Sequence, residues 1–130
     1  MIVLDASAIV ELIVEPSAAT GALRARLQAD PDIHVPHLVD AEVTNALRRK
    51  LLAGQLDLLR ARRAIRRLTV MRLTRWQQTP LLGRALALRH QLTAYDAIYV
   101  AMAEVTGATL VTQDARLARA DGHRARVEVF

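Results

Sequence analysis

The chain contains no cysteine and few aromatic residues, and each absence restricts what it can be. Without cysteine there is no disulfide and no thiolate metal ligand, a composition that fits the reducing cytoplasm. Aromatic residues make up only 3% of the chain and hydrophobic residues 52%, so alanine, leucine, valine and isoleucine must fill the core. At 130 residues the chain is long enough to bury such a core, and we expect one domain over residues 1–130.

Long hydrophobic runs and grouped histidines are also missing. The apolar N-terminal segment is interrupted by Asp5, Glu11 and Glu15 and follows no basic segment, so we predict neither a signal peptide nor a membrane span. The histidines are scattered without the spacing of zinc ligands, which argues against a zinc site: His34, His37, His90 and His123.

What the chain has in excess is positive charge. Its 18 lysine and arginine residues outnumber 13 acidic residues, which gives a formal net charge of +5. Such a balance favours a polyanionic partner, with nucleic acid first and an acidic protein second. The same composition is also typical of arginine-rich proteomes, so charge alone does not identify the partner.

Short apolar segments alternate with helical patterns along the chain. We expect strands at residues 2–4, 33–35, 70–73, 109–111 and 127–129. We expect helices up to about residue 14, from Pro16-Ser17 to 29, and at about 38–53, 56–68, 80–90, 93–107 and 115–120. The alternation predicts an α/β sandwich around a mainly parallel sheet.

The helix predicted after Thr93 differs from the others in its pattern. Thr93 and Asp96 have the spacing of a capping box, which marks a helix N-terminus. The following residues 97–103 are apolar on every side of the helix, and Gly107 ends it. A helix of this kind is predicted to be buried rather than amphipathic.

Four carboxylates stand where apolar segments end or helices begin. Asp5 and Asp114 follow predicted strands, and Glu42 and Asp96 lie in the first turns of predicted helices. If the strands are parallel, all four acids meet at the carboxyl edge of the sheet, where open α/β sheets bind ligands. Such a cluster repels itself unless cations occupy it, and oxygen ligands select hard cations such as Mg²⁺ or Mn²⁺. The sequence therefore predicts a metal-dependent phosphodiester hydrolase.

Each acid also has a plain structural interpretation. Asp5 and Asp114 are suited to cap a helix or form a turn, and Glu42 suits the helix macrodipole. Asp40 lies on the other flank of the same helix and is the alternative ligand to Glu42. Asp96 is the hardest to explain structurally, because an unpaired charge beside a fully apolar helix is costly unless a cation or donors compensate it.

Four segments of the chain resemble the acidic segments of PIN domains, which are metal-dependent nucleases of toxin–antitoxin systems and RNA processing. They occur in the family's order, at residues 2–8, 42–47, 95–97 and 110–114. Each motif is short, but the ordered set spans the whole chain. The resemblance implies a single nuclease domain over residues 1–130, a three-layer α/β/α sandwich with a parallel sheet of about five strands.

Within this family the chain looks most like the VapC toxins of bacterial type II toxin–antitoxin modules. That resemblance implies an endoribonuclease that hydrolyses RNA with Mg²⁺ or Mn²⁺. The quartet Asp5, Glu42, Asp96 and Asp114 would bind metal, with Asp5 and Asp96 as direct ligands, and Glu42 or Asp114 would position or deprotonate water. It further implies a homodimer in the cytoplasm and a VapB-type antitoxin that blocks the active site.

Two hydroxyl residues extend the resemblance to the family, and one missing acid departs from it. Ser7 and Thr112 fall where family members place hydroxyls that orient a ligand or a water, although both also suit local turns or caps. Some relatives carry another acid shortly after the fourth one. Here those positions hold Ala115, Arg116 and Leu117, so ligands for a fully occupied second metal site are missing from this pattern.

The middle of the chain combines basic residues with leucines. The basic residues predict an RNA track towards the acids, with solvated helix faces as the alternative, and the candidates are Arg48, Arg49, Arg62 and Arg63. The interleaved leucines predict a hydrophobic surface for dimerisation or antitoxin docking, formed by Leu51, Leu52, Leu56, Leu58 and Leu59.

Two other functions compete with RNA cleavage. A degenerate PIN-like module would bind RNA or protein without cutting, but the presence of all four acids argues against it. An aspartate-based phosphoryl-transfer domain would use Asp5 as a covalent nucleophile. Such domains place a second acid where Ser7 stands or use a late lysine, whereas the only lysine here is Lys50.

Overall fold

A five-stranded parallel sheet forms the centre of the computed structural model, which describes residues 1–14 and 17–130. The strand order is β3-β2-β1-β4-β5, and every neighbouring pair is parallel. The strands are β1 (Ile2–Leu4), β2 (Ile33–Pro36), β3 (Thr74–Trp76), β4 (Thr109–Thr112) and β5 (Arg126–Val129). The predicted parallel α/β fold is therefore confirmed.

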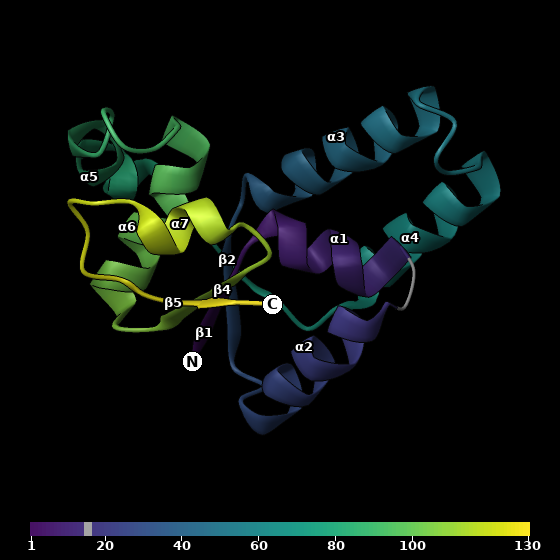
Figure 1. The fold of residues 1–130 in the computed structure, drawn as a ribbon, viewed down its shortest axis with the longest axis horizontal. Helices are drawn as coiled ribbons and strands as arrows, with labels where there is room; N and C mark the ends of the chain where they lie inside the picture. The colour runs from purple at the N-terminus through teal and green to yellow at the C-terminus, as the bar shows by residue number, and fades with distance from the viewer. Residues whose placement is uncertain (15–16) are drawn as a thin grey trace.

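Helices cover both faces of this sheet and complete three layers (Figure 1). One face carries α1 (Ala6–Val14), α2 (Ala18–Ala29), α3 (Val39–Leu52) and α4 (Leu58–Val70). The other carries the 3₁₀ turn η1 (Thr79–Leu81), α5 (Leu82–Ala87) and α6 (Ala94–Thr106), and the short α7 (Ala115–Arg119) contacts β5. Among the described residues, no helix is both long enough and apolar enough to cross a membrane.

The core forms where β1 and α6 meet. All three residues of β1 are fully buried, because the strand lies between β2 and β4 and under both helix layers. The seven residues 97–103 of α6 are buried as well, as their all-round apolar pattern predicted. Gly107 ends α6 in the left-handed conformation at φ +68°, which costs glycine little.

Three predicted boundaries need correction or fall outside the described residues. The strand predicted at residues 70–73 is wrong, since α4 continues to Val70 and β3 begins at Thr74, where it pairs with β2. The single helix predicted at residues 80–90 is instead the 3₁₀ turn followed by the six-residue α5. The predicted helix start at Pro16 lies outside the described residues, and Ser17 is the N-cap of α2.

The strand order determines where the acidic residues meet. From β1 the sheet continues to β2 on one side and to β4 on the other, so the topological switch point lies beside β1. In open parallel sheets, ligands bind beyond the carboxyl ends of the strands at such a point. Asp5 follows β1 directly, and its backbone N–H donates to the Val111 carbonyl of β4 at 3.0 Å.

Candidate active site

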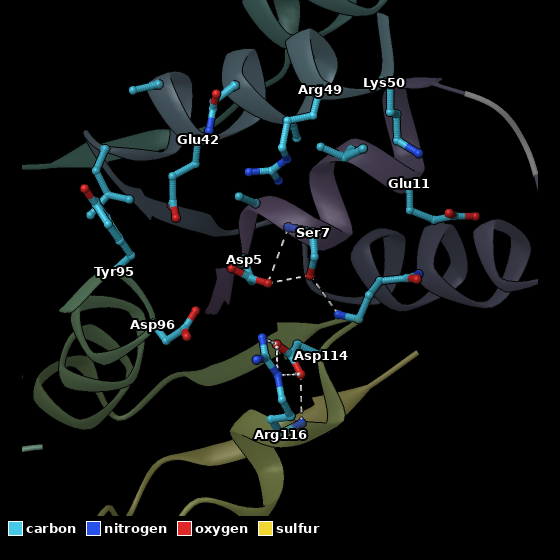
Figure 2. A pocket seen from close by; sticks show the side chains of 17 residues that line it. Asp5, Ser7, Glu11, Glu42, Arg49, Lys50, Tyr95, Asp96, Asp114 and Arg116 are labelled. Atoms are coloured by element: carbon cyan, nitrogen blue, oxygen red, sulfur yellow. Dashed lines mark hydrogen bonds and ion pairs between the residues drawn. The ribbon is translucent and has the colours of Figure 1, made fainter. Parts of the chain in front are cut away.

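A cavity of about 760 Å³ opens at the carboxyl edge of the sheet (Figure 2). All four predicted acids line it: Asp5 after β1, Asp114 after β4, and Glu42 and Asp96 in the first turns of α3 and α6. Figure 2 shows Asp5 in the middle, with the other three carboxylates around it. The topology thus brings together acids that are more than 100 residues apart.

Asp5 is the most buried of these carboxylates, with 7% of its surface exposed. Its Oδ2 accepts hydrogen bonds from the Ser7 hydroxyl, from the Thr112 hydroxyl at 2.8 Å and from the Ser7 backbone N–H at 3.3 Å. Among the described residues nothing donates to Oδ1. These donors compensate the buried charge and orient the carboxylate, and they leave one oxygen available for a ligand.

Ser7 and Thr112 connect the ends of β1 and β4. The Ser7 hydroxyl accepts from the backbone N–H of Gln113 at 3.0 Å while it donates to Asp5. The Thr112 hydroxyl accepts from the backbone N–H of Asp114 at 2.9 Å and donates to the same Asp5 oxygen. Both hydroxyls therefore hold Asp5 relative to the loop that carries Asp114.

Glu42 is positioned by a buried tyrosine on the opposite helix. The Tyr99 hydroxyl of α6 donates to Glu42 Oε2 at 2.6 Å, and Tyr99 itself is fully buried. Burial raises the pKa of Glu42, the Tyr99 hydrogen bond lowers it, and the charges of Asp5 and Asp96 raise it further. The net result is a pKa above the ordinary 4.5. Burial, together with the neighbouring Glu42, also raises the pKa of Tyr99, so the phenol remains a donor.

Asp96 is held by the N-cap of its own helix. The Thr93 hydroxyl accepts from the Asp96 backbone N–H at 3.2 Å and donates to Asp96 Oδ2 at 2.8 Å. Burial raises the pKa of Asp96 above its ordinary 3.8, and the charges of Asp5 and Asp114 add to that rise against the Thr93 hydrogen bond. Burial and neighbouring negative charges thus disfavour the ionised forms of Asp96 and Glu42 more than their hydrogen bonds favour them.

Asp114 is different, because an arginine two residues later in the chain neutralises it. The Arg116 side chain donates to both carboxylate oxygens, with Nε at 3.0 Å from Oδ1 and 2.9 Å from Oδ2. The Arg116 backbone N–H also donates to Oδ1 at 2.9 Å, which makes Asp114 the N-cap of α7. This pairing lowers the pKa of Asp114. Arg116 stands at one of the positions where the family pattern predicted a further acid.

The donor set of the cavity suits a hard divalent cation. All four carboxylates offer oxygen, and the charges of Asp5, Glu42 and Asp96 repel one another in a partly desolvated space. As they stand, no three acidic or histidine side chains of the described residues are grouped closely enough to hold an ion. Described donors bind only one oxygen of Asp5, Glu42 and Asp96, but both oxygens of Asp114. An ion would therefore compete directly with a protein donor, Arg116, only at Asp114.

Several predicted residues lie away from this cavity. Asp40, the alternative to Glu42, forms a two-pronged salt bridge with Arg75 at 2.8 Å and does not line the cavity. Of the four predicted RNA-binding arginines, only Arg49 lines it. Arg48 and Arg62 instead border a second groove, between α3 and α4, and Arg63 is exposed on α4 and lines neither the cavity nor this groove.

The predicted leucine surface is smaller than expected. Leu51 and Leu58 line the groove between α3 and α4, and Leu52 and Leu59 are exposed. The inclusion of Leu56 was wrong, because it is only 5% exposed and belongs to the core. It precedes the N-cap Asp57, and that turn directs it inward.

Sequence reasoning missed the side chains that control the acids. Tyr99 was interpreted only as part of a buried helix, although it lies three residues after Asp96 on the same helix face. Arg116 was noted only as a missing acid. The cavity is also lined by Asn45, Tyr95 and Gln113 from the acidic segments, by Lys50 from the basic run at residues 48–50, and by Glu11, for which the sequence predicts no role.

A parallel α/β/α sandwich with acids converging at its carboxyl edge defines the structural class, and comparisons with known proteins define the family. The PIN domain family model matches residues 2–123. Ribonuclease VapC1 of Mycobacterium tuberculosis (strain CDC 1551 / Oshkosh) is 39% identical over 121 residues, which cover 92% of this chain and 90% of that protein. Ribonuclease VapC3 of the same strain is 42% identical over 119 residues, 92% and 86% of the two chains. The chain therefore belongs to the PIN domain family.

A solved structure supports the fold independently. The crystal structure of VapBC2 from Rickettsia felis, bound to a DNA fragment from its promoter, superposes with a TM-score of 0.70. The match covers 100% of this chain and 99% of that chain at 17% sequence identity. A likeness at this identity shows the fold alone, so activity is argued from the site and from the closer relatives.

Proposed function

We propose that this protein is a metal-dependent endoribonuclease and the toxin of a VapBC-type toxin–antitoxin module, with residues 1–130 acting as one nuclease domain. The observation that carries the proposal is that all four acids line one cavity at the carboxyl edge of the sheet. Its relatives named as ribonucleases are similar along more than nine-tenths of the chain. RNA as substrate also suits the net charge of +5.

Asp5, Glu42, Asp96 and Asp114 are the proposed ligands of Mg²⁺ or Mn²⁺. When bound, such an ion supplies positive charge to the scissile phosphate and lowers the pKa of water. Asp5 and Asp96 are the proposed direct ligands, since Asp5 keeps Oδ1 free of protein donors and Asp96 is among the acids whose charge is least neutralised.

In hydrolysis a water oxygen bonds to phosphorus, and the bond between phosphorus and one ester oxygen breaks. One proton must leave the attacking water, and one must reach the departing oxygen. Glu42 and Asp114 are the two candidates to accept the proton of the attacking water, and the hydrogen-bond donors around each acid favour Glu42. Asp114 is engaged on both oxygens by Arg116, whereas Glu42 has one hydrogen bond, from Tyr99.

The proposed partners are an RNA substrate, a second copy of the chain in a homodimer, and a VapB-type antitoxin. The groove between α3 and α4 is a suitable docking surface for the antitoxin. Its floor is apolar, with Leu47, Leu51 and Ile65, and Arg48 and Arg62 stand at its border. An apolar segment flanked by acids would complement it. The cytoplasm, where RNA is available, is the proposed site of action.

The proposal is tested by RNA cleavage with purified protein. Wild type is expected to cut end-labelled RNA with Mg²⁺ or Mn²⁺ and to stop cutting in EDTA, while Asp96→Asn abolishes cleavage. Asp40→Asn is the matched control, because Asp40 lies on a helix of the same site but outside the cavity. Cleavage that persists in EDTA or in Asp96→Asn would refute the assignment. Beryllofluoride trapping should detect no covalent acceptor at Asp5.

A further inference from the structure

Arg116 is a basic residue that lies among the acids of the cavity. Figure 2 shows its guanidinium between the carboxylates of Asp114 and Asp96. The hydrogen bonds and charge of Asp114 raise the pKa of Arg116, and the charge of Asp96 adds to that rise. Burial raises the pKa of Asp96, and the charge of Arg116 opposes that rise. The guanidinium thus supplies positive charge to the side of the cavity that these two acids form.

The salt bridge with Asp114 uses only part of this guanidinium. Nε donates to both carboxylate oxygens of Asp114, and Nη2 donates to Oδ2. No described residue accepts a hydrogen bond from Nη1, which carries two of the N–H donors of the planar guanidinium. The side chain of Arg116 is 77% exposed and lines the cavity. Its free N–H groups are therefore open to a ligand in the cavity while the salt bridge stays in place.

A guanidinium that binds a carboxylate on one edge and a phosphate on the other resembles a bridging cation in its effect. Enzymes with two metal ions use both ions to stabilise the attacking and departing oxygens of the phosphate. Arginine stabilises the same kind of charge in phosphoryl transfer, and its planar donors match phosphate oxygens. The guanidinium stays protonated throughout, so it stabilises negative charge, and the proton of the departing oxygen comes from water.

We propose that Arg116 takes the place of a second metal ion: its guanidinium bridges Asp114 and the scissile phosphate, and the cavity takes up a single divalent cation. The inference rests on the proposed ribonuclease function and assigns a further residue to that reaction. The single cation binds chiefly through Asp5, Glu42 and Asp96, each of which keeps one oxygen without a described donor. Asp114 then acts on the phosphate through Arg116.

The number of bound ions tests this substitution directly. Calorimetric titration of the metal-free protein with Mn²⁺ should give about one ion per chain for wild type and about two for Arg116→Asp. The variant replaces an exposed cation by an acid, and the backbone N–H of residue 116 still donates to Asp114 at the start of α7. Arg119→Asp is the matched control and should bind one ion. It makes the same change of charge on the same helix, at an exposed position that does not line the cavity.

The two ions expected in Arg116→Asp must also lie side by side. Metal ions in two-metal sites are about 3.5–4 Å apart. Electron paramagnetic resonance should therefore show magnetically coupled Mn²⁺ in Arg116→Asp and isolated Mn²⁺ in wild type. The rate of RNA cleavage should follow the Mn²⁺ concentration with a Hill coefficient of about 1 in wild type and above 1 in Arg116→Asp.

The contact between Arg116 and phosphate is measured separately, by the binding of a fluorescein-labelled octauridylate in Ca²⁺. Fluorescence anisotropy gives the affinity at several salt concentrations. Arg116→Gln should reduce the slope of log affinity against log salt by about 0.7, the share of one phosphate contact with a single strand. Arg119→Gln removes the same charge outside the cavity and should leave the slope unchanged.

Three results would overturn this inference. They are two Mn²⁺ ions in the cavity of wild type, a single ion in Arg116→Asp, and a salt slope in Arg116→Gln equal to that of wild type. In each of these cases RNA cleavage by wild type in Mn²⁺ would uphold the proposed function. A wild type that neither binds Mn²⁺ nor cuts RNA would overturn both.

Discussion

The carboxylates at the strand ends, which form the floor of the cavity, and those at the helix N-termini, which form its walls, differ in how far protein contacts neutralise them. The floor pair, Asp5 and Asp114, follows strands β1 and β4, and protein donors neutralise or orient both side chains. The wall pair, Glu42 and Asp96, stands at the N-termini of helices α3 and α6. Burial and mutual repulsion raise the pKa values of this wall pair, whereas Arg116 lowers that of Asp114.

This difference indicates how an acidic site folds before any cation is present. The floor is preorganised, because hydroxyl and backbone donors link β1 to β4 through Asp5. The walls retain uncompensated charge, which a divalent cation would neutralise. Positioning and charge are thus divided between two pairs of acids, and four experiments separate them.

The largest effect is expected from Asp5→Asn. The variant should lower RNA cleavage by at least about 1,000-fold, because it removes a ligand charge while Ser7 and Thr112 still orient the amide. The midpoint temperature of thermal unfolding should be equal to or higher than that of wild type, since one buried like charge is gone. Residual cleavage within a few-fold of wild type would mean that Asp5 does not belong to the chemistry.

The next effect concerns the wall pair and the stability of the metal-free protein. The pKa values of Glu42 and Asp96 lie above their ordinary 4.5 and 3.8, so these two groups bind more protons in the folded protein than in the unfolded chain in the window above those values. The contribution of this pair to the free energy of unfolding should therefore fall as the pH rises through that window. Mg²⁺ at 100 times its Kd should restore about 2.7 kcal/mol at pH 7.

Chemical denaturation in EDTA and in Mg²⁺ measures both quantities. Relative to wild type, Glu42→Gln should gain stability as the pH rises, because the neutral amide no longer loses a proton. Asp40→Asn should leave the pH dependence that Glu42 and Asp96 contribute unchanged, since Asp40 is paired with Arg75 outside the cavity. A difference in unfolding free energy between metal-free wild type and Glu42→Gln that does not change with pH would contradict the account.

Removal of the Tyr99 hydroxyl should have an intermediate effect. Tyr99→Phe leaves Glu42 without its donor, so we expect about a 10-fold loss in kcat and a loss of stability of about 1 kcal/mol. Because the Tyr99 hydrogen bond lowers the pKa of Glu42, the acid limb of the pH–rate profile should move to higher pH. A loss of activity without that movement would indicate a merely structural role.

The smallest effect is expected from Arg116→Ala. It frees Asp114 and increases the negative charge of the cavity, so the affinity for Mn²⁺ should rise by about 5-fold or less. Arg89→Ala, outside the cavity, is the control. Unchanged or weaker Mn²⁺ binding in Arg116→Ala would show that Arg116 supports the site rather than competing with the cation.

The fold was largely predictable, because its strands and buried helix have strong local patterns. Strand-ending acids such as Asp5 and a helix cap such as Thr93 are visible in the sequence, and parallel topology places them at one edge. The strand after α4 was misplaced because the alternation of residues 70–73 is weak. β3 is defined by its pairing with β2, which no local pattern encodes.

The partners of the acids were less accessible to prediction. Tyr99 and Glu42 are 57 residues apart, and their hydrogen bond depends on how α6 and α3 approach each other across the cavity. The Arg116 salt bridge is local, but at two residues' spacing only the turn that starts α7 brings both groups together. The acidic residues in the sequence were enough to predict the chemistry of the site. The contacts that shift the pKa of each acid are visible only in the structure.

The central claim is that the four acids share divalent cations in one cavity, and calorimetric titration with Mn²⁺ tests it most directly. We expect saturable binding to wild type, with proton release at a pH where Glu42 and Asp96 are partly protonated, and strongly weakened binding in both Asp5→Asn and Asp96→Asn. Binding that is absent from wild type, or unchanged in both variants, would contradict the account.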